Sequence, residues 1–277
     1  MTDAETTAAR PTGRDIVPRR FWVGLVAVAA YVLIAGVGAN LLLELVAPSD
    51  ELVDFALGHF ISVPILIVAG LAFVRRSGWS RDVWRAPASW ETRPRRWWLL
   101  AIPALMLIQS LVQLGTAPWG DQQLGAIVVV AVGLALVGIG EELYFRGILR
   151  VSVRAHHGEF LTLLVTASLF GLAHSFGSLM QGFPLGTIAF QVSVTAFTGV
   201  SLYAAFRATG RLWVPMALHA LDDFSIYLHS GEPSSVQAPG TPVTVTVQLL
   251  LGVLAVVLVV STIREDAHAR KAASAGA

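Results

Sequence analysis

The sequence has no cysteine among its 277 residues, and only 13% of its residues are charged. Without cysteine the chain has no disulfide framework, no thiolate metal site and no cysteine nucleophile. Soluble domains are usually about 25% charged, so this chain has too few polar residues to cover a globular surface. These shortages exclude an ordinary cytosolic enzyme, a disordered protein and a nucleic-acid-binding protein.

Long apolar runs take the place of the missing polar residues. The hydrophobic share is 55% and the mean hydropathy is +0.68. A bilayer core of about 30 Å needs about 20 apolar residues in a helix, and a backbone in lipid must satisfy its own hydrogen bonds. The fold class is therefore predicted to be all-α, a polytopic membrane protein. We expect about eight transmembrane helices, at residues 21–47, 54–74, 97–116, 124–146, 160–177, 185–206, 211–229 and 242–263.

The basic residues support this division of the chain and predict an orientation. If the N-terminus is cytoplasmic, all 19 Lys and Arg residues fall within or at the edge of the cytoplasmic segments, whereas the outer loops carry acidic residues. This distribution follows the positive-inside rule. We therefore expect both termini to be cytoplasmic, with a tail at 1–20, a transmembrane core at 21–263 and a second tail at 264–277.

The longest predicted cytoplasmic segment, 75–96, holds three tryptophans and many arginines. Trp79, Trp84 and Trp90 lie in it. Such a composition suits a segment that lies on the inner leaflet of the membrane. A solvated loop would explain the same composition equally well.

Ionisable side chains inside a membrane span are costly and usually mark function. Three of the predicted spans have none, and Glu44 and His59 in the first two are assigned no chemistry. The fourth, fifth and seventh spans carry the others, and we regard a coincidence of packing as a poor explanation for so many. The residues concerned are Glu141, Glu142, Arg146, His174, His219, Asp222 and Asp223.

Helical spacing sorts these residues into pairs. Residues four apart share a helix face, so Glu142 can pair with Arg146, and an intramembrane carboxylate needs such a partner. A buried pair of this kind often does no more than stabilise the helix that carries it. Glu141 has no cation of its own in the sequence nearby. On the seventh span His219 and Asp223 share a face, and Asp222 points elsewhere.

Two chemistries fit Glu141, His174, His219 and Asp223. They could bind Zn²⁺ and leave one coordination position for water. Alternatively, Glu141 could activate water directly as a general base. Both produce a hydroxide-like nucleophile in the membrane. A serine nucleophile has less support, because no serine lies in a nucleophile elbow, and the His-Glu-x-x-His signature of soluble zinc proteases is absent.

The predicted depths of these residues do not agree. At 1.5 Å per residue, Glu141 lies only a few ångströms from the inner end of its span, His219 about 12 Å from its own end and His174 about 21 Å. Straight helices with the predicted ends cannot bring the three together. Either the fifth helix begins in the cytoplasm or the fourth begins outside the membrane. We expect a site in the inner half of the bilayer that opens to the cytoplasm.

Three motifs at these positions resemble a known family, the CPBP intramembrane proteases (CAAX proteases and bacteriocin-processing enzymes, also called the Abi family). The family pattern is Glu-Glu-x-x-x-Arg, then Phe-x-x-x-His, then His-x-x-x-Asn or Asp. The resemblance covers about 124–228. The matching segments here are Glu141-Glu142-Leu-Tyr-Phe-Arg146, Phe170-Gly-Leu-Ala-His174 and His219-Ala-Leu-Asp-Asp223.

The resemblance implies roles for these residues. Glu141 and His174 would activate the water that attacks a peptide carbonyl, and His219 with Asp223 would stabilise the oxyanion or complete a metal site. Glu142, Arg146 and Phe170 would support them. The family more often has Asn where this chain has Asp223. Ionised Asp cannot donate a hydrogen bond, so Asp223 suits a metal ligand or an orienter of His219 better. This favours zinc, although the family includes members described as metalloproteases and others described as glutamate-dependent.

The resemblance implies an intramembrane endopeptidase, a CPBP-family metalloprotease or glutamate-dependent hydrolase. Its partners would be the lipid bilayer and a membrane-associated or lipidated peptide or protein at the inner leaflet, in a bacterial plasma membrane, with no nucleic acid. One alternative is a non-enzymatic scaffold or bacteriocin-immunity-type protein of the same fold. Another is a transporter that uses the same groups as a proton relay, although we find no internal repeat of the kind that many transporters have.

Overall fold

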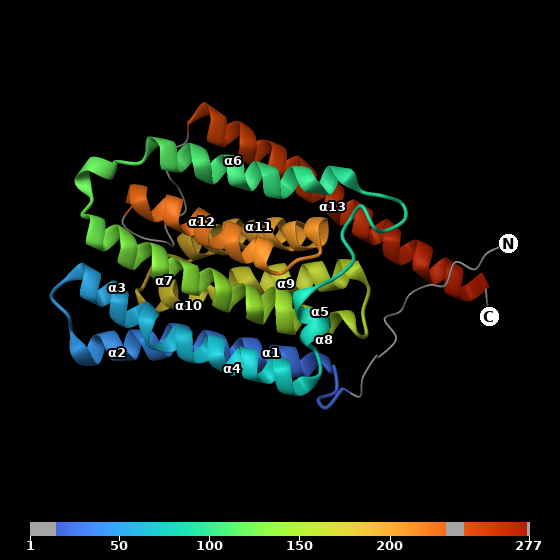
Figure 1. Cartoon of the computed structure of the whole chain (residues 1–277), viewed down its shortest axis with the longest axis horizontal. Coiled ribbons are helices and arrows are strands. Elements are labelled where there is room, and N and C mark those ends of the chain that lie inside the picture. Colours follow the sequence, from blue (N-terminus) through green and yellow to red (C-terminus); the bar gives the residue numbers. More distant parts are fainter. Residues whose placement is uncertain (1–14, 231–240, 276–277) are drawn as a thin grey trace.

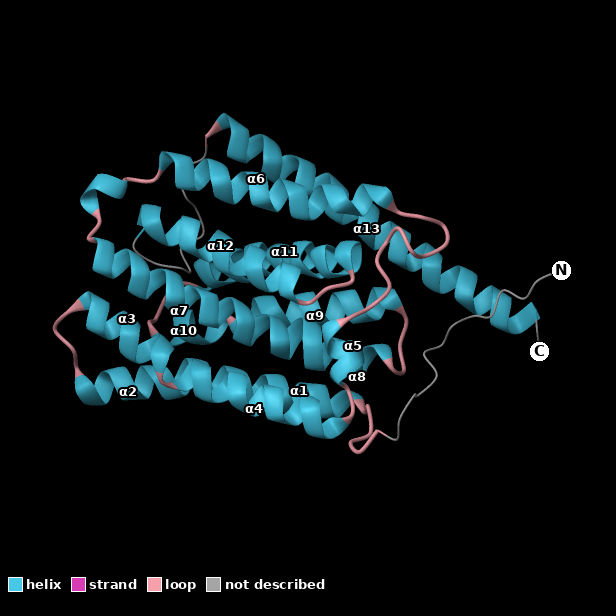
Figure 2. Ribbon diagram, in the orientation of Figure 1, coloured by secondary structure: helices cyan, strands magenta, loops and turns pink. Residues whose placement is uncertain are grey.

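The computed structural model describes residues 15–230 and 241–275, and over these residues the chain is a bundle of helices without a β-strand (Figures 1 and 2). The predicted all-α class is therefore confirmed. Part of the predicted N-terminal tail, residues 1–14, lies outside the described residues. The one isolated β-bridge in the described part joins Arg85 to Arg211, where the chain enters the helix that carries His219.

The first half of the described chain crosses the bundle three times. Phe21–Val46 is one continuous helical segment with a π-helical turn inside it, and the next crossing is broken at Ile61. The third crossing begins with a short 3₁₀ turn. The elements are α1 (Phe21–Val32), η1 (Leu33–Gly38), α2 (Ala39–Val46), α3 (Glu51–Phe60), α4 (Ser62–Ser77), α5 (Ser80–Trp84), η2 (Trp97–Leu100) and α6 (Ala101–Thr116).

The second half contains the helices with ionisable residues. They lie in the middle of the bundle, with α1 to α4 on one side and α6 and α13 on the other (Figure 1). The elements are η3 (Trp119–Asp121), α7 (Leu124–Glu142), η4 (Leu143–Leu149), α8 (Arg150–Arg154), α9 (Glu159–Ala173), α10 (Ser175–Met180), α11 (Leu185–Thr209), α12 (Trp213–Ser230) and α13 (Pro242–Ala275).

Seven helical segments among the described residues are long and apolar enough to span a membrane. The multi-pass membrane architecture predicted from the apolar runs is thus present. The seventh predicted span, 211–229, forms α12 but does not meet the same hydropathy requirement. Its two aspartates and two histidines lower its hydropathy. The helix packs against α6, α7 and α11, so protein covers much of its surface.

The fourth crossing is longer than the apolar run predicts. Helix α7 continues without a break through the π-helical η4 into α8, so the span runs from Leu124 to Arg154 rather than ending at 146. Arg146 and Arg150 are predicted to lie at a cytoplasmic edge, yet both are buried. Arg146 pairs with Glu142, and Arg150 donates to the Asp82 carbonyl and lies over the Phe206 ring. These partners allow the helix to continue.

Trp79 lies in neither of the environments predicted for segment 75–96. Its ring is completely buried, and its Nε1–H donates to the Val17 carbonyl oxygen at 2.9 Å. Trp90 is half-buried and stacks on Trp97. The segment therefore packs against the end of the helix bundle rather than extending away from it.

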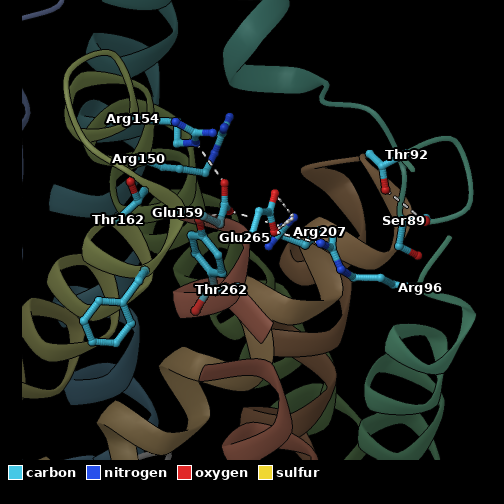
Figure 3. A network of polar contacts seen from close by, with 12 residues as sticks. Ser89, Thr92, Arg96, Arg150, Arg154, Glu159, Thr162, Arg207, Thr262 and Glu265 are labelled. Atoms are coloured by element: carbon cyan, nitrogen blue, oxygen red, sulfur yellow. Dashed lines mark hydrogen bonds and ion pairs between the residues drawn. The ribbon is translucent and has the colours of Figure 1, made fainter. Parts of the chain in front are cut away.

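A network of charged residues ties α13 to this same end of the bundle (Figure 3). Arg207 Nε lies 3.2 Å from Glu159 Oε1, and Arg207 Nη2 lies 3.2 Å from Glu265 Oε2. Arg96 contacts Glu265 as well, at 3.3 Å. Asp266 accepts hydrogen bonds from the first backbone N–H groups of α9, those of Glu159 and Phe160, and so caps that helix.

The predicted C-terminal tail is part of this arrangement. Residues 264–275 continue the helix of α13 to Ala275, and α13 extends beyond the neighbouring helices (Figure 1). The apolar run ends near 263, but the helix does not, because its next turn is held by the ion pairs of Glu265 and the cap provided by Asp266.

Candidate active site

Close contact between α7 and α12 places the first catalytic candidates. A Cβ atom at Gly138 would lie 2.8 Å from the Met216 carbonyl oxygen and 2.9 Å from the Ala220 amide nitrogen. Only glycine fits there without pushing the helices apart. Glu142, four residues further on, shares this face of α7 and meets His219. The sequence Gly-Ile-Gly-Glu-Glu therefore brings two carboxylates against α12.

The structure brings together all four residues that are predicted to carry the chemistry. Glu141 Oε2 lies 3.9 Å from His174 Nε2 and 3.9 Å from His219 Nε2. His219 Nε2 lies 3.3 Å from Asp223 Oδ2. Three separate helical segments, α7, the end of α9 and α12, therefore converge on the Glu141 carboxylate.

The longer fourth crossing resolves the conflict between the predicted depths. Glu141 is 13 residues from Arg154, the last residue of the continuous helix, which corresponds to about 20 Å. His174 lies at the end of α9, about 22 Å from its first residue, Glu159. This extension of the fourth helix, which neither expected solution included, places both residues at similar distances from the same end of the bundle.

The side chains of the site are largely buried, and of His219, Glu141 and His174 the last is the most exposed. The side chain of His219 is 5% exposed and that of Glu141 16% exposed, whereas His174 reaches 26%. Glu141 Oε2 is itself buried and has no hydrogen-bond partner among the described residues. An acceptor oxygen left unpaired in a dry environment is costly unless a bound molecule contacts it.

His174 is held in one orientation by its own helix. Its Nδ1 lies 2.8 Å from the carbonyl oxygen of Phe170. Because a carbonyl only accepts, Nδ1 carries the hydrogen and Nε2 presents its lone pair toward Glu141. The α-helical pattern also ends at Ala173, so His174 occupies the turn between α9 and α10. The ring is therefore presented at a helix end.

Glu142 and Arg146 contact residues of other helices in addition to stabilising their own. Their side chains are completely buried, with Arg146 Nη1 2.6 Å from Glu142 Oε1, and the same carboxylate oxygen lies 3.2 Å from His219 Nδ1. Arg146 also donates to the Gly199 carbonyl at 2.9 Å and lies 4.1 Å above the Phe170 ring. The pair thus links the position of His219 to that of Phe170.

Phe170 packs beneath both histidines. Its ring centroid is 5.0 Å from that of His174 and 5.5 Å from that of His219. Asp222 points away from this cluster, as the helical spacing predicted, and its carboxylate accepts a hydrogen bond from Ser110 on α6 at 3.4 Å. The Phe170 ring therefore forms an apolar surface on one side of the cluster, and Asp222 lies outside the cluster.

The donor chemistry of this cluster suits zinc, because neutral imidazole and carboxylate are its usual ligands. The arrangement is less suitable. Among residues 15–230 and 241–275, no three His, Asp or Glu side chains form a group that could hold a metal ion. Tetrahedral ligands at about 2.0–2.2 Å lie about 3.3–3.6 Å from one another, closer than the two 3.9 Å separations around Glu141. The residues as placed do not form a closed zinc site.

Residues 123–225 match the family model described as Rce1-like, type II CAAX prenyl endopeptidase. Over this segment, which is less than half of the chain, the sequence is similar to the CAAX proteases. Neither the curated proteins nor the solved structures give a match. The matched segment contains the four clustered residues and the Glu142–Arg146 pair, so the resemblance noted from three short motifs extends across the whole of the site.

This match supports an intramembrane endopeptidase in general. Together with the seven apolar helical segments, it identifies an integral multi-pass membrane protein. Sequence reasoning missed one neighbour of the site. Tyr31 of α1 packs against Gly140, beside Glu141. No local signal marks it, because Tyr31 lies in an ordinary apolar run far from the motifs.

Proposed function

We propose that this protein hydrolyses peptide bonds inside the membrane, using a water molecule that Glu141 and His174 activate. The observation that carries the proposal is the position of Glu141 Oε2, a buried oxygen without a partner among the described residues that lies 3.9 Å from Nε2 of two histidines on other helical segments. This separation is too long for a direct hydrogen bond. It suits a bridging water, which needs polar partners on more than one side.

The chemistry follows from the acceptors around that water. Glu141 and the lone pair of His174 Nε2 accept its two hydrogens, which leaves an oxygen lone pair to attack the substrate carbonyl. Glu141 takes one proton as the new C–O bond forms and gives it to the leaving amine when the C–N bond breaks. His219, held between Glu142 and Asp223, borders the same space.

An apolar groove beside the site supports a lipid-bearing substrate. A cavity of about 360 Å³ lies between α6 and α12, and its walls are almost entirely apolar. Leu218 lines it and is the neighbour of His219 in the chain. A lipid chain in this groove would hold an attached peptide near Glu141. The family description names prenyl endopeptidases, and we extend to this chain only the broader class of membrane-associated or lipidated peptides and proteins.

The positive-inside distribution of arginine supports a cytoplasmic location for both termini and cleavage near the inner leaflet. The site would then open toward the cytoplasmic half of the bilayer. Substrates would reach it by lateral diffusion in the membrane rather than from the aqueous phase. Nucleic acid plays no part in this activity.

Hydrolysis by direct attack of water predicts an isotopic result. Purified protein in liposomes, given a lipidated peptide in H₂¹⁸O, should produce a new C-terminal carboxylate that contains one ¹⁸O atom per cleavage. The measurement is mass spectrometry of the product, with peptide in empty liposomes as the control. Absence of any cleavage product across a panel of farnesylated, acylated and transmembrane peptides would favour the non-enzymatic scaffold instead.

Zinc, the other interpretation of the motifs, has its own test. Because the described residues form no closed metal site, we expect the cleavage rate to change less than twofold after treatment with 1,10-phenanthroline. Elemental analysis of the purified protein should likewise find far less than one zinc per chain. If chelation abolishes cleavage and added Zn²⁺ restores it, zinc is required and the metal-free mechanism is wrong.

A further inference from the structure

Tyr31 is a buried tyrosine of α1 that packs against Tyr144 and Gly140. The residue is 3% exposed, and its hydroxyl makes no hydrogen bond to another described residue, although its oxygen is not one of the completely buried unpaired atoms. Tyr144, whose ring lies 4.7 Å away between centroids, provides the contrast because its hydroxyl donates to the Leu66 carbonyl oxygen at 2.9 Å. Hydroxyl groups of buried residues are usually paired, so an unpaired one indicates a place where a ligand group can bind.

The position of this hydroxyl is set by Gly140. A Cβ atom at residue 140 would lie 2.9 Å from Tyr31 Oη, so the absence of a side chain allows the hydroxyl to approach α7. Residue 140 immediately precedes Glu141 in α7. The hydroxyl therefore lies close to the candidate active site, although α1 is outside the segment that matches the family model.

Helix geometry shows on which side of Glu141 the hydroxyl lies. Successive residues on a helix are turned by about 100°. Gly138 and Glu142 face α12, and Gly140 faces α1. Glu141 points between these two directions. The face of α7 that meets Tyr31 and the face that meets His219 therefore lie on either side of Glu141.

The catalytic cluster itself lacks free hydrogen-bond donors. Attack of water on a peptide carbonyl places negative charge on its oxygen, and donors aimed at that oxygen lower the barrier. Glu141 and Asp223, when ionised, only accept. The Nδ1–H of His174 is used by the Phe170 carbonyl, and both ring nitrogens of His219 face carboxylates.

Arg146 does not provide a donor for the oxyanion either. Its Nη1 and Nη2 groups donate to Glu142 and to the Gly199 carbonyl. Its Nε has no partner among the described residues, but the side chain is completely buried above the Phe170 ring. The Tyr31 hydroxyl, by contrast, donates no hydrogen bond to another described residue and lies against Gly140, the residue before Glu141.

We propose that Tyr31 is a further catalytic residue, which donates a hydrogen bond to the oxyanion formed during peptide hydrolysis. The proposal rests on the hydrolase function proposed above. The C–O bond forms from the attacking water, Glu141 takes the water proton, and the carbonyl π electrons move to oxygen. Tyr31 keeps its proton and stabilises that oxygen until the C–N bond breaks.

The test is Tyr31→Phe, which removes one oxygen atom and keeps the ring. We expect kcat to fall about 100-fold, the size of effect seen when one oxyanion donor is lost, while KM changes less than about twofold. Tyr144→Phe is the matched control, since it removes a hydroxyl from the adjacent ring that is already bonded to Leu66. This control should keep kcat and lower only thermal stability.

Gly140→Ala provides a second, independent test. The new methyl group should displace the hydroxyl, because it would lie 2.9 Å from Tyr31 Oη. We expect a loss of kcat in the wild-type background and little further loss when Tyr31→Phe is already present. Equal, additive losses in both backgrounds would show that Gly140→Ala acts on packing alone and would contradict the proposal.

The outcomes separate this inference from the hydrolase function. If the wild-type protein cleaves and Tyr31→Phe cleaves at the same kcat, Tyr31 is not catalytic and the function still holds. A rise in KM without a change in kcat would also overturn the inference, since it indicates substrate binding. If the wild-type protein cleaves nothing under any condition, the proposed function itself fails.

Discussion

Replacing Glu141 by Gln should reduce peptide cleavage at least 10³-fold while leaving the protein folded in the membrane. The amide cannot accept a proton from water, and a general base contributes about 10²–10⁴ to a hydrolytic rate. The change keeps the size of the side chain. It removes no hydrogen bond at Oε2, which has none among the described residues. Single-turnover cleavage of a lipidated peptide in liposomes measures the effect.

A matched control is available in the same protein. Glu44 is an exposed carboxylate on α2, so Glu44→Gln makes the same chemical change away from the site. This variant should cleave at the wild-type rate. Thermal unfolding in detergent should show that both variants remain folded. Near wild-type cleavage by the Glu141→Gln protein would show that another group is the base.

Replacing Arg146 by Met should have the largest effect on stability. Arg146 and Glu142 form a completely buried ion pair with a 2.6 Å contact, and the substitution leaves Glu142 without its partner. Breaking a buried pair in this way costs about 3–5 kcal/mol in the free energy of unfolding. The variant also loses the bond to Gly199 and the contact with the Phe170 ring. Unfolding by a denaturing detergent measures the loss.

The double variant Glu142→Gln with Arg146→Met separates stability from activity. Removing both charges avoids an unpaired ion, so we expect part of the lost stability to return. Cleavage should remain low, because His219 no longer has a carboxylate at Nδ1 to fix its ring. If the double variant cleaves like the wild-type protein, the pair only stabilises the fold and does not position His219.

The residues of the candidate site could be predicted from the sequence because a membrane span makes ionisable groups conspicuous. Glu141, His174, His219 and Asp223 stand out against runs of Ala, Val and Leu, and helical spacing correctly separated Asp222 from Asp223. The fold class followed from the same contrast between apolar and polar segments. Both inferences depend only on local composition and on the helical repeat.

The ends of the helices could not be predicted in this way. An arginine at the end of an apolar run is interpreted as a residue at the membrane–water interface. Hydropathy alone cannot show that Arg146 and Arg150 have partners within the protein. The same applies to the last helix, which continues past 263 because Glu265 and Asp266 bind groups on other helices. Tyr31 was missed because its contact with Gly140 joins residues far apart in the chain.

The cap on α9 has a consequence for the order in which this protein is assembled. Asp266, which binds the first two amides of α9, lies 107 residues after Glu159 in the chain, and α9 carries His174 at its other end. During synthesis from the N-terminus, the first turn of α9 is not capped until α11, α12 and the apolar part of α13 have been made. A nascent chain that has already inserted the motif helices is thus still without the cap on one of them.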